Sequence, residues 1–126
     1  MTILDKIIAF KKQEVAKIKK DVPVKRLVDS PSFKRTPISL KESLIDPYST
    51  GIIAEFKRQS PSKGIINGKA TITDVTTGYM EANVAAQSIL TDTSFFGGTM
   101  ADVMAARTIN STKPILRKDF VVDGFQ

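Results

Sequence analysis

IIAEFKRQSPSKG, residues 52–64, is the stretch that decides the fold. Its apolar start at residues 52–54 leads directly into Glu55 and Lys57, which stand two positions apart. In a β-strand, residues at this spacing point to the same face. A buried strand rarely carries a carboxylate and an ammonium group on one face unless they meet each other or a ligand. A loop signal follows at residues 60–62, so the charged pair ends the strand, where α/β barrels place their catalytic groups.

The composition is that of an ordinary globular domain. The chain has 126 residues, of which 41% are hydrophobic and 25% charged, values that favour an ordered globular protein over a disordered one. No apolar run reaches the ~20 residues of a membrane-spanning helix. Lys6, Lys11 and Lys12 interrupt the apolar N-terminal segment, which is not typical of a signal peptide. We therefore expect a cytoplasmic protein with no membrane partner.

The absent residue types restrict the chemistry. The chain has no cysteine, which excludes disulfides and thiol catalysis, and no histidine, the commonest metal ligand and neutral-pH acid–base group. Proton transfer must then use Lys, Asp, Glu or Tyr. A lysine acts as a general acid near neutral pH when burial or neighbouring cations lower its pKa. A magnesium site made of carboxylates alone stays open, but no spacing argues for one.

The net charge of +6 has two interpretations. A cationic surface attracts nucleic acid or anionic membranes, whereas cationic side chains in a pocket bind phosphate or carboxylate substrates. Many of the lysines fall within residues 6–26, where a helix with a solvated polar face accounts for them. Few aromatic residues are interleaved with them, and no nucleic-acid-binding motif is present. We therefore expect no nucleic-acid partner.

The hydrophobic periodicity predicts an amphipathic helix over residues 2–20, with Leu4, Ile7, Ile8, Val15 and Ile18 on one stripe and the lysines opposite. A short helix over 40–45 is ambiguous. From residue 51 the pattern is regular. It predicts strands at 51–57, 86–91 and 114–117, helices at 71–85 and 99–109, and a loop at 58–70. Threonine–aspartate pairs three residues apart predict helix starts at residues 2, 71 and 99.

Alternating strands and helices predict a parallel sheet with right-handed crossovers. A third strand with no following helix leaves one sheet edge unpaired, and a complete eight-unit barrel needs about 250 residues. We therefore expect an α/β fold: the N-terminal part of a (β/α)8 barrel, with about three βα units at 48–126 after a helical extension at 1–47. Exposed apolar strand surfaces predict that such a partial barrel self-associates.

Other residues with candidate chemistry follow the same strands. Lys118 lies between Arg117 and Asp119, and strand alternation predicts that only one of Arg117 and Lys118 faces the site. The segment Asp92 to Gly98 ends in two phenylalanines and two glycines. The glycine pair forms a turn or, less commonly, exposes N–H groups to an anion. Ser60 either hydrogen-bonds a substrate or only shapes its turn.

Three motifs in order, IAEFKRxSPSKG, LTDxxFFGG and PILRKDF, resemble indole-3-glycerol phosphate synthases. The segment ILDKIIAFKKQEV resembles the extra leading helix of that family. The resemblance implies a (β/α)8 barrel that closes the indole ring of 1-(2-carboxyphenylamino)-1-deoxyribulose 5-phosphate, with loss of CO2 and water. It implies no metal and no organic cofactor.

The resemblance also implies roles for individual residues. Lys118 matches the general acid, Lys57 the lysine that binds the substrate carboxylate, and Glu55 the glutamate paired with both. Ser60 matches a serine that contacts substrate, and the apolar residues near the anthranilate ring match Phe96 and Phe120. The second catalytic glutamate, an asparagine and the phosphate-binding loops of the family lie on later strands. We therefore expect this chain to be inactive alone.

Two alternatives remain open. One is another barrel enzyme acting on a phosphosugar, such as a phosphoribosylanthranilate isomerase or an aldolase that forms a Schiff base on Lys57 or Lys118. The other is a basic module that binds nucleic acid.

Overall fold

The computed structural model describes residues 1–126, which form two compact units. The first unit comprises residues 1–36 and 120–126, and the second comprises residues 37–119. None of the helices combines the length and the apolar character needed to cross a bilayer.

Helix α1 (Ile3–Asp21) dominates the first unit. Its start is as predicted: the Thr2 hydroxyl accepts a hydrogen bond from the backbone of Asp5, and the Asp5 carboxylate accepts one from the backbone of Thr2. A short second helix, α2 (Val24–Val28), follows Pro23 and was not predicted. With only five residues, it is too short for its periodicity to stand out in the sequence.

The predicted stripe of α1 needs one correction. Ile7 and Val15 are buried as expected, but Lys11 lies between them at four-residue spacing and is only 2% exposed. Leu4 and Ile18 are about half exposed. Lys11 therefore belongs to the buried face rather than to the solvated one. Its ammonium group bonds Glu14 at 2.6 Å, one turn further along, which offsets the loss of hydration.

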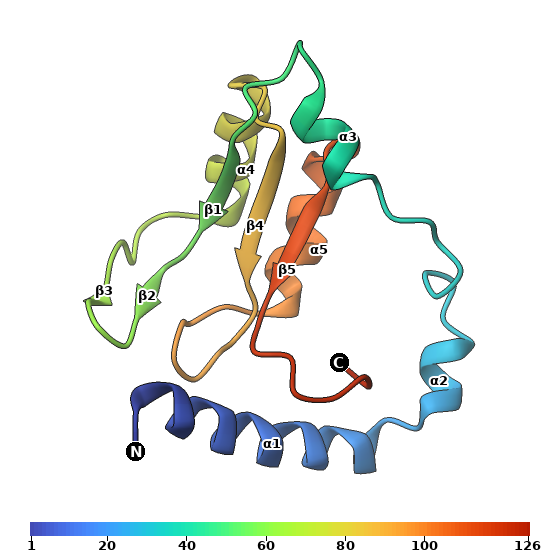
Figure 1. Ribbon diagram of the computed structural model, residues 1–126, viewed down its shortest axis with the longest axis vertical. Helices are drawn as coiled ribbons and strands as arrows, with labels where there is room; N and C mark the ends of the chain where they lie inside the picture. The colour runs from blue at the N-terminus through green and yellow to red at the C-terminus, as the bar shows by residue number, and fades with distance from the viewer. The chain divides into compact units, whose positions relative to one another are not determined.

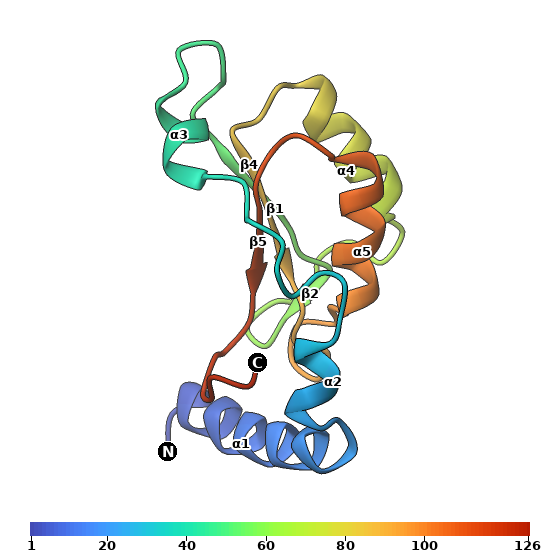
Figure 2. The same cartoon turned by 90° about the vertical axis from the view of Figure 1, so that its right-hand side faces the viewer.

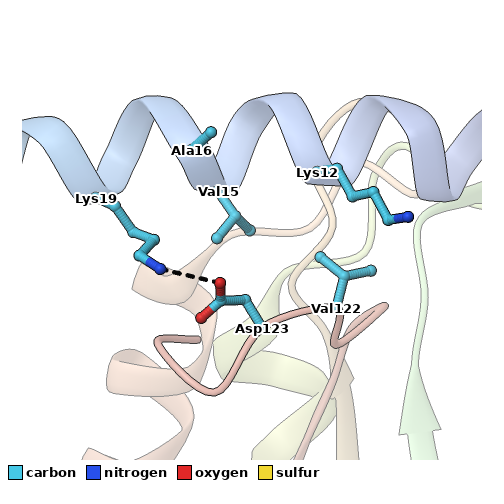
Figure 3. A pocket seen from close by; sticks show the side chains of 6 residues that line it. All are labelled: Lys12, Val15, Ala16, Lys19, Val122 and Asp123. Carbon is cyan, nitrogen blue, oxygen red and sulfur yellow. Dashed lines mark hydrogen bonds and ion pairs between the residues drawn. The ribbon is translucent and has the colours of Figure 1, made fainter.

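The C-terminal segment, residues 120–126, lies alongside α1 (Figures 1 and 2). Lys19 Nζ bonds Asp123 Oδ2 at 3.0 Å and lies 6.0 Å from the centre of the Phe125 ring. A hollow of about 300 Å³ lies between the helix and the segment, beside the Lys19–Asp123 contact. Figure 3 shows Val15 and Val122 projecting into this hollow, with the Lys19–Asp123 pair at one side.

The second unit is built on a parallel three-stranded sheet of order β1-β4-β5 (Figure 1). Its strands are β1 (Ile53–Phe56), β4 (Ala86–Leu90) and β5 (Ile115–Lys118). In the register, Glu55 lies opposite Ser88, and Leu90 lies opposite Lys118. The parallel sheet is thus confirmed. The charged residues of β1 and β5 lie at the same end of the sheet, where the parallel strands finish, which is called its C-terminal edge below.

Helices α4 (Ile72–Glu81) and α5 (Met100–Ile109) cover one face of this sheet (Figure 2). Phe56, Ile89 and Ala106 form the core, and five partly buried residues pack against it: Ala70, Ile72, Val75, Val103 and Ile115. Both predicted starts are confirmed, since the hydroxyls of Thr71 and Thr99 each accept a hydrogen bond from the backbone three residues on. Helix α4 ends earlier than predicted, because Asn83 adopts a φ of 55° that no helix continues through.

Two further elements complete the second unit. The segment left ambiguous by its sequence pattern is a helix, α3 (Leu40–Ile45), and Ser43 on it donates a hydrogen bond to the carbonyl of Ala85, just before β4. The segment expected to be an irregular loop after β1 contains a small antiparallel hairpin, β2 (Gln59–Ser60) with β3 (Gly64–Ile65). A φ of 63° at Gly64 allows the chain to turn between these strands.

Candidate functional site

One carboxylate and two ammonium groups meet at the C-terminal edge of the sheet. Glu55 Oε1 lies 3.1 Å from Lys57 Nζ, and Glu55 Oε2 lies 2.9 Å from Lys118 Nζ. Glu55 and Lys57 share a face of β1 because they are two residues apart. Lys118 reaches the same carboxylate from β5, across the central strand β4. The predicted convergence of these three side chains is confirmed.

The environment of Glu55 keeps it charged. Its burial disfavours the carboxylate form, but hydrogen bonds and Coulomb attraction from Lys118 and Lys57 outweigh this effect, so the pKa of Glu55 is lowered. The Glu55 side chain is 26% exposed, against 33% for Lys57 and 51% for Lys118. A partly open cluster with a net positive charge suits the binding of an anionic ligand.

Two contacts of Glu55 were missed by the sequence analysis. Ser88 Oγ donates a hydrogen bond of 3.2 Å to Glu55 Oε2 from the neighbouring strand β4. Tyr79 in α4 donates one of 2.8 Å to the backbone carbonyl of Glu55. A serine in an apolar strand and a tyrosine on a helix carry no local signal of such contacts. The strand register alone would have identified Ser88.

Strand alternation separates Arg117 from Lys118, as predicted. Lys118 turns to Glu55, whereas Arg117 Nε donates to the Thr91 hydroxyl at 3.2 Å and Arg117 Nη2 lies 3.5 Å from Asp119 Oδ2. Thr91 Oγ1 donates to the same Asp119 oxygen at 2.8 Å. These contacts tie the ends of β4 and β5 together on the face away from Glu55.

Arg58 connects the end of β1 to the start of α5, and sequence analysis assigned it no role. Its guanidinium group makes two hydrogen bonds to the Asp102 carboxylate, one of 2.8 Å. It also donates to the carbonyl of Gly97 at 3.3 Å, and its Cζ lies 4.8 Å from the centre of the Phe56 ring. Because Arg58 follows Lys57 directly, this anchor limits the movement of the strand end that carries Lys57.

The segment between β4 and α5 is a turn that satisfies its own backbone groups. The Asp92 side chain accepts hydrogen bonds from the backbone of Phe95 and Phe96 at 2.8 and 3.2 Å. The N–H groups of Gly97 and Gly98 donate to the carbonyls of Thr93 and Asp92. The interpretation as a turn is confirmed, and these glycine N–H groups are already used rather than directed at an anion.

The other predicted site residues have different surroundings. Ser60, in β2, accepts a hydrogen bond from the backbone of Lys63 at 3.2 Å, so it shapes the hairpin turn. Phe96 is half-buried in the turn after β4. Phe120 belongs to the first compact unit, where its carbonyl accepts a hydrogen bond from the Gln126 side chain at 3.0 Å. Substrate contacts of Ser60, Phe96 and Phe120 stay predictions.

Asp102 is expected to make the free energy of unfolding depend on pH in the acidic range. The hydrogen bonds from Arg58 lower the pKa of Asp102, although its burial opposes this. The unfolded chain therefore binds the proton more readily, and the stabilisation present above the unfolded pKa is lost as pH falls through the folded pKa. Asp102→Asn should lower the free energy of unfolding at pH 7 by about 2 kcal/mol. This difference should shrink toward zero below the folded pKa.

Urea unfolding of both proteins between pH 2 and pH 7 measures this difference. Asp74→Asn is the matched control, because Asp74 occupies the same position in α4 but its carboxylate is exposed and has no arginine partner. A difference between Asp102→Asn and the unsubstituted chain that stays constant over this range would contradict the assignment.

Comparison with known proteins identifies the family. A family model described as "Indole-3-glycerol phosphate synthase" matches residues 4–126. The chain belongs to the indole-3-glycerol phosphate synthase family. It is 42% identical over 124 residues to the indole-3-glycerol phosphate synthase of Bacteroides thetaiotaomicron. The corresponding identities are 39% for that of Campylobacter fetus and 40% for that of Caldanaerobacter subterraneus.

Each of these synthases is about twice as long as the chain. The match covers 98% of the chain but only 47% or 48% of each relative. The chain thus spans about half the length of the curated relatives that it matches. The expected resemblance to this synthase family, restricted to an N-terminal portion, is confirmed.

No group of three or more Asp or Glu side chains that could hold a metal ion occurs in residues 1–126, and the chain has no His or Cys. The contacts of Glu55 with Lys57 and Lys118 make this cluster the candidate site.

Proposed function

We propose that this chain supplies the general acid and the carboxylate-binding lysine of an indole-3-glycerol phosphate synthase. The reaction closes the ring of 1-(2-carboxyphenylamino)-1-deoxyribulose 5-phosphate and releases CO2 and water. The observation that carries the proposal is the Glu55 carboxylate held between two ammonium groups at the C-terminal edge of a parallel sheet. Membership of the synthase family supports it.

The roles follow from charge and position. Lys118, the more exposed lysine, protonates the substrate carbonyl as the ring carbon attacks. Lys57 binds the substrate carboxylate and serves as an acid in the dehydration. Glu55 stays ionised and positions both ammonium groups before the substrate binds. Ser60 contacts the substrate, and the phenylalanines at 96 and 120 pack near its aromatic ring. None of these steps requires a metal or an organic cofactor.

The proposal extends to the architecture and the surroundings of the chain. Residues 48–126 form about the first three βα units of a (β/α)8 barrel, and residues 1–47 are its helical extension.

The exposed apolar side chains of Ile53 and Leu116 support self-association of the chain when it is alone. Light scattering would show it, and a stable monomer would contradict it. A cytoplasmic location stays a prediction, and so does the absence of a nucleic-acid partner.

The direct test compares two proteins. One is the chain of residues 1–126, and the other is the same chain fused to the second half of the Bacteroides thetaiotaomicron relative. Formation of the indole product is followed by its fluorescence. We expect turnover from the fusion and none from the chain alone, because half of the relatives' length is missing from it. A fusion that folds but does not turn over would contradict the proposal.

Borohydride separates this chemistry from that of an aldolase. A lysine that forms a Schiff base is trapped covalently when borohydride reduces the imine. General acid catalysis forms no such bond, so we expect no adduct with the phosphosugar substrate. Mass spectrometry that finds an adduct on Lys57 or Lys118 would favour the aldolase.

A further inference from the structure

Ser88 lies outside the motifs that define the site, yet it contacts the carboxylate at its centre. It is 3% exposed, occupies the central strand β4 and lies directly opposite Glu55 in the register. Its hydroxyl donates to Glu55 Oε2 at 3.2 Å. We propose that Ser88 is a positioning residue that holds the Glu55 carboxylate while Lys57 and Lys118 turn from Glu55 to an anionic substrate. This inference rests on the proposed function.

The three groups that bind the Glu55 carboxylate differ in rigidity. Each lysine side chain has four rotatable bonds, and both are substantially exposed, so holding either in one conformation costs side-chain entropy. The serine side chain has one rotatable bond to its oxygen. Strand β4 is paired on both sides, with Glu55 and Leu116 flanking Ser88 in the register. The sheet therefore fixes the position of the Ser88 hydroxyl and leaves the ammonium groups mobile.

The charges give this difference a consequence. A substrate whose carboxylate binds Lys57 and whose carbonyl takes a proton from Lys118 competes with Glu55 for the two ammonium groups. If both moved to the substrate, the half-buried Glu55 carboxylate would lose two charged donors, and leaving it unpaired would be unfavourable. Ser88 still donates to Oε2 in that state. Because a hydroxyl is neutral, it holds Glu55 without weakening the attraction between the lysines and the anion.

Tyr79 does not duplicate this role. Its hydroxyl donates to the backbone carbonyl of Glu55 and leaves the carboxylate untouched. Burial, and then the nearby Glu55 charge, raise the pKa of Tyr79, so it remains a donor throughout the neutral range. Tyr79 fixes the strand, whereas Ser88 fixes the side chain.

The test removes the ammonium groups and asks what still holds Glu55. In the 126-residue chain with Lys57→Met and Lys118→Met, NMR measures two properties of Glu55. One is the titration midpoint of its carboxyl carbon, and the other is the set of scalar couplings that report its χ1 rotamer. Ser88→Ala and Ser88→Thr are then added separately, and amide spectra verify the fold of each variant. The same serine substitutions with both lysines retained give a second comparison.

With Ser88 present, we expect one Glu55 rotamer. Ser88→Ala should average the couplings and shift the midpoint to higher pH, and Ser88→Thr, which keeps the hydroxyl, should reverse both changes. With the lysines retained, the alanine shift should have the same sign and be smaller. Couplings and midpoint that do not respond to Ser88→Ala would overturn the inference. A change that threonine does not reverse would also overturn it, because it would assign the effect to packing. Since no turnover is measured, a failure of the proposed function stays distinguishable.

Discussion

Replacing Lys118 by methionine is expected to lower kcat by on the order of 10³-fold in a complete synthase that contains this chain. Methionine keeps the length of the side chain but can neither donate a proton nor carry a charge. The Lys118 side chain is 51% exposed, and an exposed ion pair contributes less than about 1 kcal/mol, so the fold should tolerate the change. Steady-state kinetics of the fusion described above measure the effect.

Lys69→Met is the matched control for this substitution. Lys69 is an exposed lysine of the second unit with no salt bridge, and its replacement should leave kcat unchanged. If the two variants are equally stable in urea, the loss of kcat in Lys118→Met reflects the chemical step and not unfolding. Retention of activity within tenfold by Lys118→Met would contradict a role for Lys118 as the general acid.

Gly98→Ala is expected to destabilise the second unit by about 4 kcal/mol or more. A Cβ at this position would lie 1.9 Å from the carbonyl oxygen of Leu90 and 2.5 Å from its carbonyl carbon. Neither atom can move without disturbing β4, whose end carries the turn that contains Phe96. The glycine is therefore required by the close approach of two backbone segments. Urea unfolding followed by circular dichroism measures the loss.

The chain offers a glycine with the opposite expectation. Gly78 lies in the exposed part of α4, and a Cβ there would meet no atom within 4 Å. Gly78→Ala should therefore stabilise the fold by about 0.5–1 kcal/mol, since alanine restricts the unfolded chain.

A Gly98→Ala variant whose free energy of unfolding lies within about 1 kcal/mol of that of the unsubstituted chain would mean that the backbones at Gly98 and Leu90 are not in contact.

Local patterns in the sequence predicted the elements that carry the site. Threonine–aspartate pairs identified three helix starts, and the two-residue spacing of Glu55 and Lys57 placed both on one face of a strand. Alternation also separated Arg117 from Lys118. These features depend on residues within one turn of a helix or one strand, where residue type and spacing suffice.

Contacts between distant residues could not be predicted in the same way. Ser88 is 33 positions from Glu55, and Arg58 is 44 positions from Asp102. Only the pairing of strands and the packing of α5 bring these residues together. The charge of Lys11 predicts a place on the polar face, yet its position in the helix places it between Ile7 and Val15 on the buried face. Tertiary packing overrides residue type in that case.

The titration of Glu55 in the 126-residue chain tests the central claim most directly. If its carboxylate bridges the two ammonium groups, the NMR titration midpoint lies below the ordinary value of 4.5. It then rises in Lys118→Met and again when Lys57 is also replaced, because each substitution removes a donor to the charged form. A midpoint at or above 4.5 that neither substitution changes would contradict the claim.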